Sequence, residues 1–200
     1  MTRHFTEDAN AISEQASRHA IRLGHPYLGG EHFLLALSAA SQPVGAVLRE
    51  HGVTPERTEA EIVRLSGGGL FGDLDRDALA AVGVDVDAVR ATTEASFGRE
   101  TLTGAARAAH PKPRWFDLRP IGGAWPDGVC LPHGPGAGQA LTGATRRARA
   151  RDVTQPAGVE DLALGILAVS EGLVPPVLAA LGVSGAALST AILDRYQSAS

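Results

Sequence analysis

The chain contains two stretches with the same residue pattern, and the second copy is degraded. The first reads LGGEHFLLAL around Glu31, and the second reads AGVEDLALGI around Glu160. Each precedes a segment typical of a helical hairpin, VLREHGVTPERTEAEI from Val47 and VLAALGVSGAALSTAI from Val177. A chain built from two similar helical units favours paired docking surfaces over a single catalytic cleft. The repeat therefore predicts an all-α protein that acts by binding.

The first copy predicts four helices. Thr6, followed by two acidic residues, is typical of a helix N-cap, and Gly24 is a natural stop after a helix with one apolar stripe. Gly29-Gly30 begins a second helix, Pro43 suits the first turn of a third, and Thr54 caps a fourth.

A shorter pattern, Leu-x-x-x-Gly-Val followed by a polar residue, occurs three times, from Leu48, Leu79 and Leu178. In each, the glycine can end one helix in a left-handed conformation, and the polar residue can cap the next. The middle occurrence predicts an extra helical hairpin between the two units.

The composition predicts four segments. Prolines and glycines accumulate after about residue 110, which interrupts both helix and sheet. We expect a first unit at 1–66, an inserted helical hairpin at 67–109, a Pro/Gly-rich linker at 110–135 and a second, degraded unit at 136–200.

Composition also excludes several classes of protein. The net charge of -4 argues against a dedicated nucleic-acid binder. Lys112 is the sole lysine and lies in PKP, so no G-x-x-x-x-G-K-[ST] phosphate loop exists and we expect no nucleotide hydrolysis. Cys130 is the sole cysteine and no apolar run is long enough to span a bilayer, so we expect a cytoplasmic protein without a membrane partner.

Two groups of residues are of types that can carry chemistry, but their spacing favours neither a metal site nor a nucleophile. His25, Glu31 and His32 are residue types that bind zinc, but adjacent helical positions point about 100° apart and there is no H-E-x-x-H. Cys130 lies near His133, yet proximity in a Pro/Gly-rich loop is no sign of a nucleophile. We expect no catalytic residues, no metal and no cofactor.

Basic and aromatic residues leave further interpretations open. Arg146, Arg147, Arg149 and Arg151 form the densest basic run, which favours a solvated surface paired with acids over phosphate contacts. Trp115 and Trp125 lie in the expected linker, where we interpret them as anchors to the helical body.

The first unit resembles a known family. FTEDANAISEQASRHAIRLGHPYLGGEHFLLAL is similar to the start of the Clp amino-terminal repeat domain, whose pattern resembles FTxxA…A…A…LGHxxIGTEHLLLGL. The resemblance is strong over about residues 3–66 and weak over about 136–196. It implies the substrate- and adaptor-docking module of ClpA- and ClpC-type unfoldases, here free of ATPase modules.

In ClpC-type relatives each repeat can hold a phosphorylated arginine. The resemblance implies Thr6 and Glu31 as contacts in a first pocket and Glu160 alone in a second. A carboxylate suits the guanidinium, while a hydroxyl and a helix start suit the phosphate. By this alignment Gly134-Pro135 replaces the Phe-Thr start in the second copy. Glu31 and Thr6 are also ordinary helix-start residues.

The resemblance implies a non-catalytic docking module in Clp-mediated proteolysis: an adaptor, a decoy or a modulator of a Clp unfoldase. The expected partners are Clp unfoldase or protease subunits, their substrates and adaptors, and small peptides that target Clp amino-terminal domains. The alternative is a helical regulatory or nucleic-acid-binding module that uses the Arg146–Arg151 face.

Overall fold

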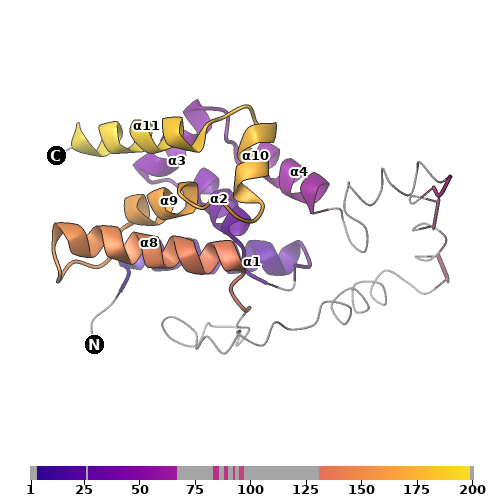
Figure 1. Cartoon of the computed structure of the whole chain (residues 1–200), viewed down its shortest axis with the longest axis horizontal. Helices are drawn as coiled ribbons and strands as arrows, with labels where there is room; N and C mark the ends of the chain where they lie inside the picture. The colour runs from indigo at the N-terminus through magenta and orange to yellow at the C-terminus, as the bar shows by residue number, and fades with distance from the viewer. Residues whose placement is uncertain are drawn as a thin grey trace.

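A computed structural model describes residues 4–25, 27–66, 83–85, 88–89, 92, 95–96 and 131–198. Most of the expected hairpin and linker lies outside the described residues, as do Lys112, Trp115, Trp125 and Cys130. The all-α prediction is confirmed, because the described part of the chain has helices and no strand (Figure 1). The helices are α1 (Glu7–Arg22), α2 (Gly30–Ala39), α3 (Pro43–Glu50), α4 (Pro55–Leu65), α8 (Pro135–Arg151), α9 (Val159–Leu167), α10 (Val174–Ala180) and α11 (Gly185–Gln197).

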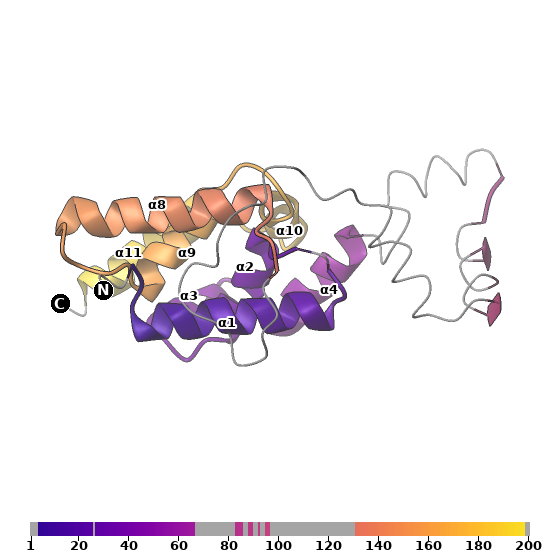
Figure 2. The same ribbon diagram turned by 90° about the horizontal axis from the view of Figure 1, so that it is seen from below.

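The other helices pack around a central pair, α2 and α9. In Figure 2, α1 and α8 lie on opposite sides of this pair, with α1 against α2 and α8 against α9. Further contacts, of α3 with α11 and of α4 with α10, also link the two units.

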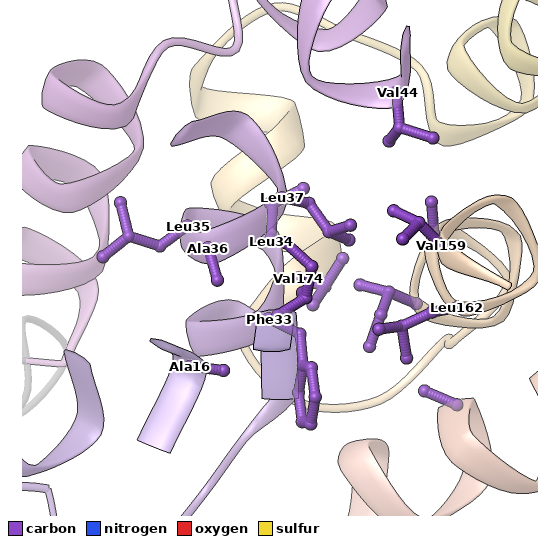
Figure 3. Packing of buried hydrophobic residues seen from close by; sticks show 14 of the residues in the cluster. Ala16, Phe33, Leu34, Leu35, Ala36, Leu37, Val44, Val159, Leu162 and Val174 are labelled. Atoms are coloured by element: carbon purple, nitrogen blue, oxygen red, sulfur yellow. The ribbon is translucent and has the colours of Figure 1, made fainter. Parts of the chain in front are cut away.

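One apolar core joins the two units. Phe33 and Leu34 of α2 lie close to Val159 and Leu162 of α9 in a continuous buried cluster (Figure 3). Burying a side chain of this size contributes roughly 1.5–3 kcal/mol. The two units therefore depend on each other for much of their burial.

The helix ends follow the predicted capping chemistry. The Ala9 N–H donates to the Thr6 hydroxyl at 3.2 Å, and the Arg57 N–H donates to the Thr54 hydroxyl at 3.4 Å. The glycines of the three Leu-x-x-x-Gly-Val patterns all have left-handed backbones, with φ of 81°, 83° and 75° at Gly52, Gly83 and Gly182. Ser184 is the N-cap of α11 as predicted, but its side chain makes no capping hydrogen bond.

Two isolated parallel bridges connect one unit to the other. Phe5 pairs with Ala157 just before α9, and Leu28, just before α2, pairs with His133. Each unit thus supplies a strand-like residue to the other, in a reciprocal arrangement.

The bridges correct the alignment of the two copies. Leu28 and Ala157 occupy matching places before α2 and α9, so Phe5 matches His133 rather than Gly134. Thr6, the N-cap of α1, accordingly matches Gly134, the N-cap of α8. The one-residue error arose because α8 has 17 residues and α1 has 16.

Among the described residues, no single helix has the length and apolar character to cross a membrane. α10 and α11, which meet at 91°, pass that length-and-composition test only when they are taken together as a bent pair.

Candidate functional site

At the start of α2, the side chain of a glutamate folds back over the N-cap glycine. Gly29 is the N-cap, Gly30 is the first helical residue, and Glu31 is buried with 2% of its surface exposed. A Cβ on Gly29 would overlap the Glu31 carboxylate, and a Cβ on Gly30 would lie 2.9 Å from Val174 Cγ2. The missing side chain of Gly29 therefore makes the space in which the carboxylate lies, whereas that of Gly30 makes room for Val174 of α10.

Glu31 Oε1 is buried and has no hydrogen-bond partner among the described residues. Burial raises the pKa of this carboxyl group. His32 Nδ1 lies 3.4 Å from Oε1, which is an ion-pair distance only for a charged imidazole. Burial, and next the neighbouring His25, lowers the pKa of His32 to about 3, so its ring is neutral at pH 7. The contact brings two acceptors together and leaves Oε1 without a donor.

His32 and His25 form a hydrogen-bonded pair. The Gly29 N–H donates to His32 Nδ1 at 2.9 Å, so the proton of the neutral ring must lie on Nε2. That nitrogen is 2.7 Å from His25 Nδ1 and donates to it. The pair fastens the loop after α1 to the first turn of α2.

The positions of the two histidines and Glu31 also decide whether they can bind a metal ion together. Ligand atoms of His25, Glu31 and His32 lie within 4.8 Å of one another, closer than the sequence spacing suggested. A metal ligand must be an unprotonated nitrogen, however, and His32 Nε2 carries the ring proton. This hydrogen-bond pattern favours a structural histidine pair over a metal centre.

The segment before α8 borders the Glu31 site. The Gly134 N–H donates to the Leu28 carbonyl at 2.9 Å, and the Tyr27 ring lies 3.0 Å from where a Gly134 Cβ would be. Burial, then the nearby Glu31 charge, raises the pKa of Tyr27. Gly134 begins α8 without a side-chain cap, so this long helix presents its partial positive charge here.

The start of α9 repeats the backbone arrangement with different chemistry. A Cβ on Gly158 would overlap the Glu160 carboxylate, as at Gly29, and Asp161 accepts the Gly158 N–H at 3.1 Å in the place of His32. Asp161 is fully buried. Arg151 donates to both Asp161 oxygens, at 2.7 and 2.5 Å, and to Glu160 at 3.4 Å. An arginine of the chain itself thus engages this carboxylate pair.

Thr6 lies at the Glu160 site, and the predicted grouping of Thr6 with Glu31 is wrong. The Thr6 N–H donates to the Ala157 carbonyl at 3.0 Å, beside the start of α9. Glu31 follows the opposite end of α1, a helix roughly 24 Å long. Burial, then the charges of Glu160 and Asp8, raises the pKa of Tyr196 to about 12.

The basic run on α8 is only partly paired. Arg151 forms the ion pair described above, whereas Arg146, Arg147 and Arg149 are exposed and have no acidic partner among the described residues. The prediction of a surface paired with acids is therefore wrong for these three. Sequence reasoning also missed Tyr27 and the Arg151 contact, although an aspartate at the His32 position was a signal for a basic partner.

No family model matches the chain. A stretch of 78 residues is 38% identical to a probable ATP-dependent Clp protease ATP-binding subunit of Chlamydia pneumoniae, covering 36% of this chain and 9% of that protein. Another of 64 residues is 36% identical to chloroplastic chaperone protein ClpC of Pisum sativum, covering 32% and 7%. An uncharacterised Mycobacterium tuberculosis protein is 41% identical over 59 residues, covering 30% and 23%. The matches thus span less than a quarter of each relative.

Two solved structures share the whole fold. The amino-terminal domain of the chaperone ClpD from Arabidopsis thaliana has a TM-score of 0.58 at 18% identity, covering 98% of this chain and 97% of that one. The Hsp104 amino-terminal domain from Candida albicans has a TM-score of 0.52 at 14% identity, covering 94% and 89%. The fold is therefore similar to that of Clp amino-terminal domains, and about a third of the chain is similar in sequence to Clp subunits.

Proposed function

We propose that this chain is a non-catalytic docking module in Clp-mediated proteolysis, acting as an adaptor, a decoy or a modulator of a Clp unfoldase. The likeness to the ClpD amino-terminal domain over 98% of the chain supports this function, as do the sequence matches to Clp subunits. Its partners are Clp subunits or their substrates and adaptors.

The observation that carries the proposal is the Glu31 carboxylate, which is buried without a partner on Oε1 beside the uncapped start of α8. An unpaired buried carboxylate costs stability, so its presence supports a ligand that supplies the missing donor. A guanidinium can donate two parallel hydrogen bonds to a carboxylate, and a helix start can receive a phosphate. The site therefore suits a phosphorylated arginine, with Glu31 as the charge partner.

The Glu160 site is the weaker candidate. Thr6 lies beside it, but the Arg151 guanidinium already contacts Glu160 and Asp161. A ligand guanidinium would have to displace this internal arginine. Of the three proposed ligand-binding residues, Glu31 thus carries the function, whereas Thr6 and Glu160 belong to a second site that the chain itself fills.

Affinity capture from the native cytoplasm tests the docking function. Immobilised protein should retain Clp unfoldase or protease subunits identified by mass spectrometry, and Glu31→Ala should reduce their recovery while Glu160→Ala should not. Recovery of nucleic acid or a transcription complex in place of Clp subunits would support the alternative, a regulatory module that uses the free arginines of α8.

A further inference from the structure

We propose that the outer face of α8 and the end of α9 form a second docking surface, which binds an acidic, extended peptide segment of a partner protein. Two adjoining hollows lie on this face, of about 440 and 300 Å³. They share Gln139, Gly143 and Arg146 as lining residues. We call this surface the α8 groove. Its remaining lining residues are Gly138, Thr142, Arg147, Gly165, Ala168 and Val169.

The floor of the α8 groove is open because the helices lack side chains there. Within the described part of the chain, a Cβ on Gly138 would meet no atom within 4 Å, and a Cβ on Gly143 would meet only Gly165 Cα, at 3.8 Å. Internal packing therefore does not require glycine at either position. Glycine inside a helix costs about 1 kcal/mol relative to alanine, so a bound segment would give these two glycines a role that folding does not.

The charged residues that border the α8 groove indicate which kind of ligand it binds. Arg18, Arg22, Arg64, Arg151 and Arg195 each contact a carboxylate, whereas Arg146 and Arg147 border the groove without an acidic partner among the described residues. An arginine fork binds carboxylates in bidentate fashion. The complementary ligand is therefore a segment with at least one aspartate or glutamate beside small residues that fit the glycine floor.

The dimensions favour a short extended chain. From Gly138 to Arg146 the groove follows α8 for roughly 12 Å, which about four extended residues would span. A nucleic acid fits this surface less well, because the chain has a net charge of -4 and the groove offers only two arginines. The surface does not involve Glu31, so it extends the proposed function without depending on it.

The test uses the full chain and a labelled peptide of about eight alternating glutamates and alanines, blocked at both ends, in fluorescence anisotropy titrations at near-physiological salt. We expect saturable binding that a glutamine-alanine peptide does not show. Arg146→Ala and Arg147→Ala should each weaken it about ten-fold, the loss of one charge-assisted contact. Gly138→Leu places a side chain in the groove at a position where a Cβ meets no described atom within 4 Å, and it should abolish binding.

Arg149→Ala is the matched control, because Arg149 is also exposed and lacks an acidic partner in the described ranges but does not line the groove. It should change affinity less than two-fold. The proposal is overturned if no saturable binding occurs or if Arg149→Ala weakens binding as much as Arg146→Ala, which would indicate diffuse electrostatic attraction. Tighter binding of a single-stranded oligonucleotide than of the acidic peptide would likewise overturn it in favour of a nucleic-acid surface.

Discussion

The first turns of α2 and α9 have the same backbone arrangement and different side-chain chemistry. In both, a glycine N-cap lies beneath a folded-back glutamate, and the residue after that glutamate accepts the glycine N–H. At α2 the acceptor is neutral His32, which leaves Glu31 without a donor on Oε1. At α9 the acceptor is Asp161, whose charge is balanced by Arg151. One difference, histidine against aspartate, thus separates a buried glutamate that lacks a donor on Oε1 from a carboxylate pair that contacts an internal arginine.

The comparison indicates how a duplicated fold can lose one of two equivalent sites without losing structure. Arg22 and Arg151 end α1 and α8 at matching positions. Arg22 turns to Glu59 of α4 at 2.6 Å, whereas Arg151 turns to the start of α9. The aspartate at position 161 gives the second arginine a buried partner that the first does not have.

Removing Arg151 should have the largest effect on stability. Arg151→Ala leaves the buried Asp161 carboxylate without its cation, and we expect a loss of about 2–3 kcal/mol, less than for a fully buried pair because Arg151 is half exposed. Arg22→Ala, at the matching position with an exposed partner, should cost less than about 1 kcal/mol. Urea denaturation measures both. Equal losses in the two variants would contradict the contrast between the two sites. Added guanidinium should partly restore the stability of Arg151→Ala but not that of Arg22→Ala.

The histidine pair should make stability depend on acid. The pKa of His32 is about 3 in the folded chain against an ordinary value of 6.5, so on acidification the unfolded chain binds a proton that the folded chain does not. Stability should therefore be full above pH 6.5 and fall as pH drops toward 3. His25 and His133, whose pKa values burial also lowers, act in the same direction.

His32→Gln keeps an acceptor for the Gly29 N–H and cannot titrate in this range. Its free energy of unfolding should depend less steeply on pH between 6.5 and 3, by up to about 1.4 kcal/mol per pH unit. His4→Gln, a change at an exposed residue, serves as the control. An unchanged slope in His32→Gln would show that the ring is protonated in the folded chain and that the assigned hydrogen bonds are wrong.

Neutralising Glu31 should have a smaller effect, in the stabilising direction. The raised pKa of Glu31 means that burial disfavours its charged form. The chain is therefore more stable when Glu31 is protonated, and it loses this stability as the pH rises through the folded-state pKa of Glu31. Glu31→Gln should therefore be more stable than the native chain at pH 7, by about 1 kcal/mol, and the gain should vanish in acid. Glu160→Gln should show no gain, because Glu160 is partly exposed and contacts Arg151. Thermal melts across pH measure both changes, and destabilisation by Glu31→Gln would show that the carboxylate has a structural partner.

Local signals in the sequence predicted most of the fold. Thr6, Thr54 and the left-handed glycines act through neighbours a few residues away, so they could be recognised without knowledge of the tertiary structure. The all-α class and the helix starts at Gly30 and Pro43 followed from the same rules.

The sequence did not predict which helix starts share a site. Thr6 lies with the α9 start and Gly134 with the α2 start because the bridges at Phe5 and Leu28 cross between the units. Such pairing depends on the packing of α2 against α9, which no local pattern encodes. The one-residue offset between α1 and α8 also concealed the match of Phe5 with His133.

Isothermal titration calorimetry with free phosphoarginine tests the central claim most directly, which is that Glu31 is open to a ligand while Glu160 is filled by Arg151. We predict a stoichiometry near one for the native chain, a loss of about ten-fold or more in affinity for Glu31→Ala, and little change for Glu160→Ala. Provided that it remains folded, Arg151→Ala should raise the stoichiometry toward two. A stoichiometry near two for the native chain, or a Glu160→Ala loss as large as that of Glu31→Ala, would contradict the account.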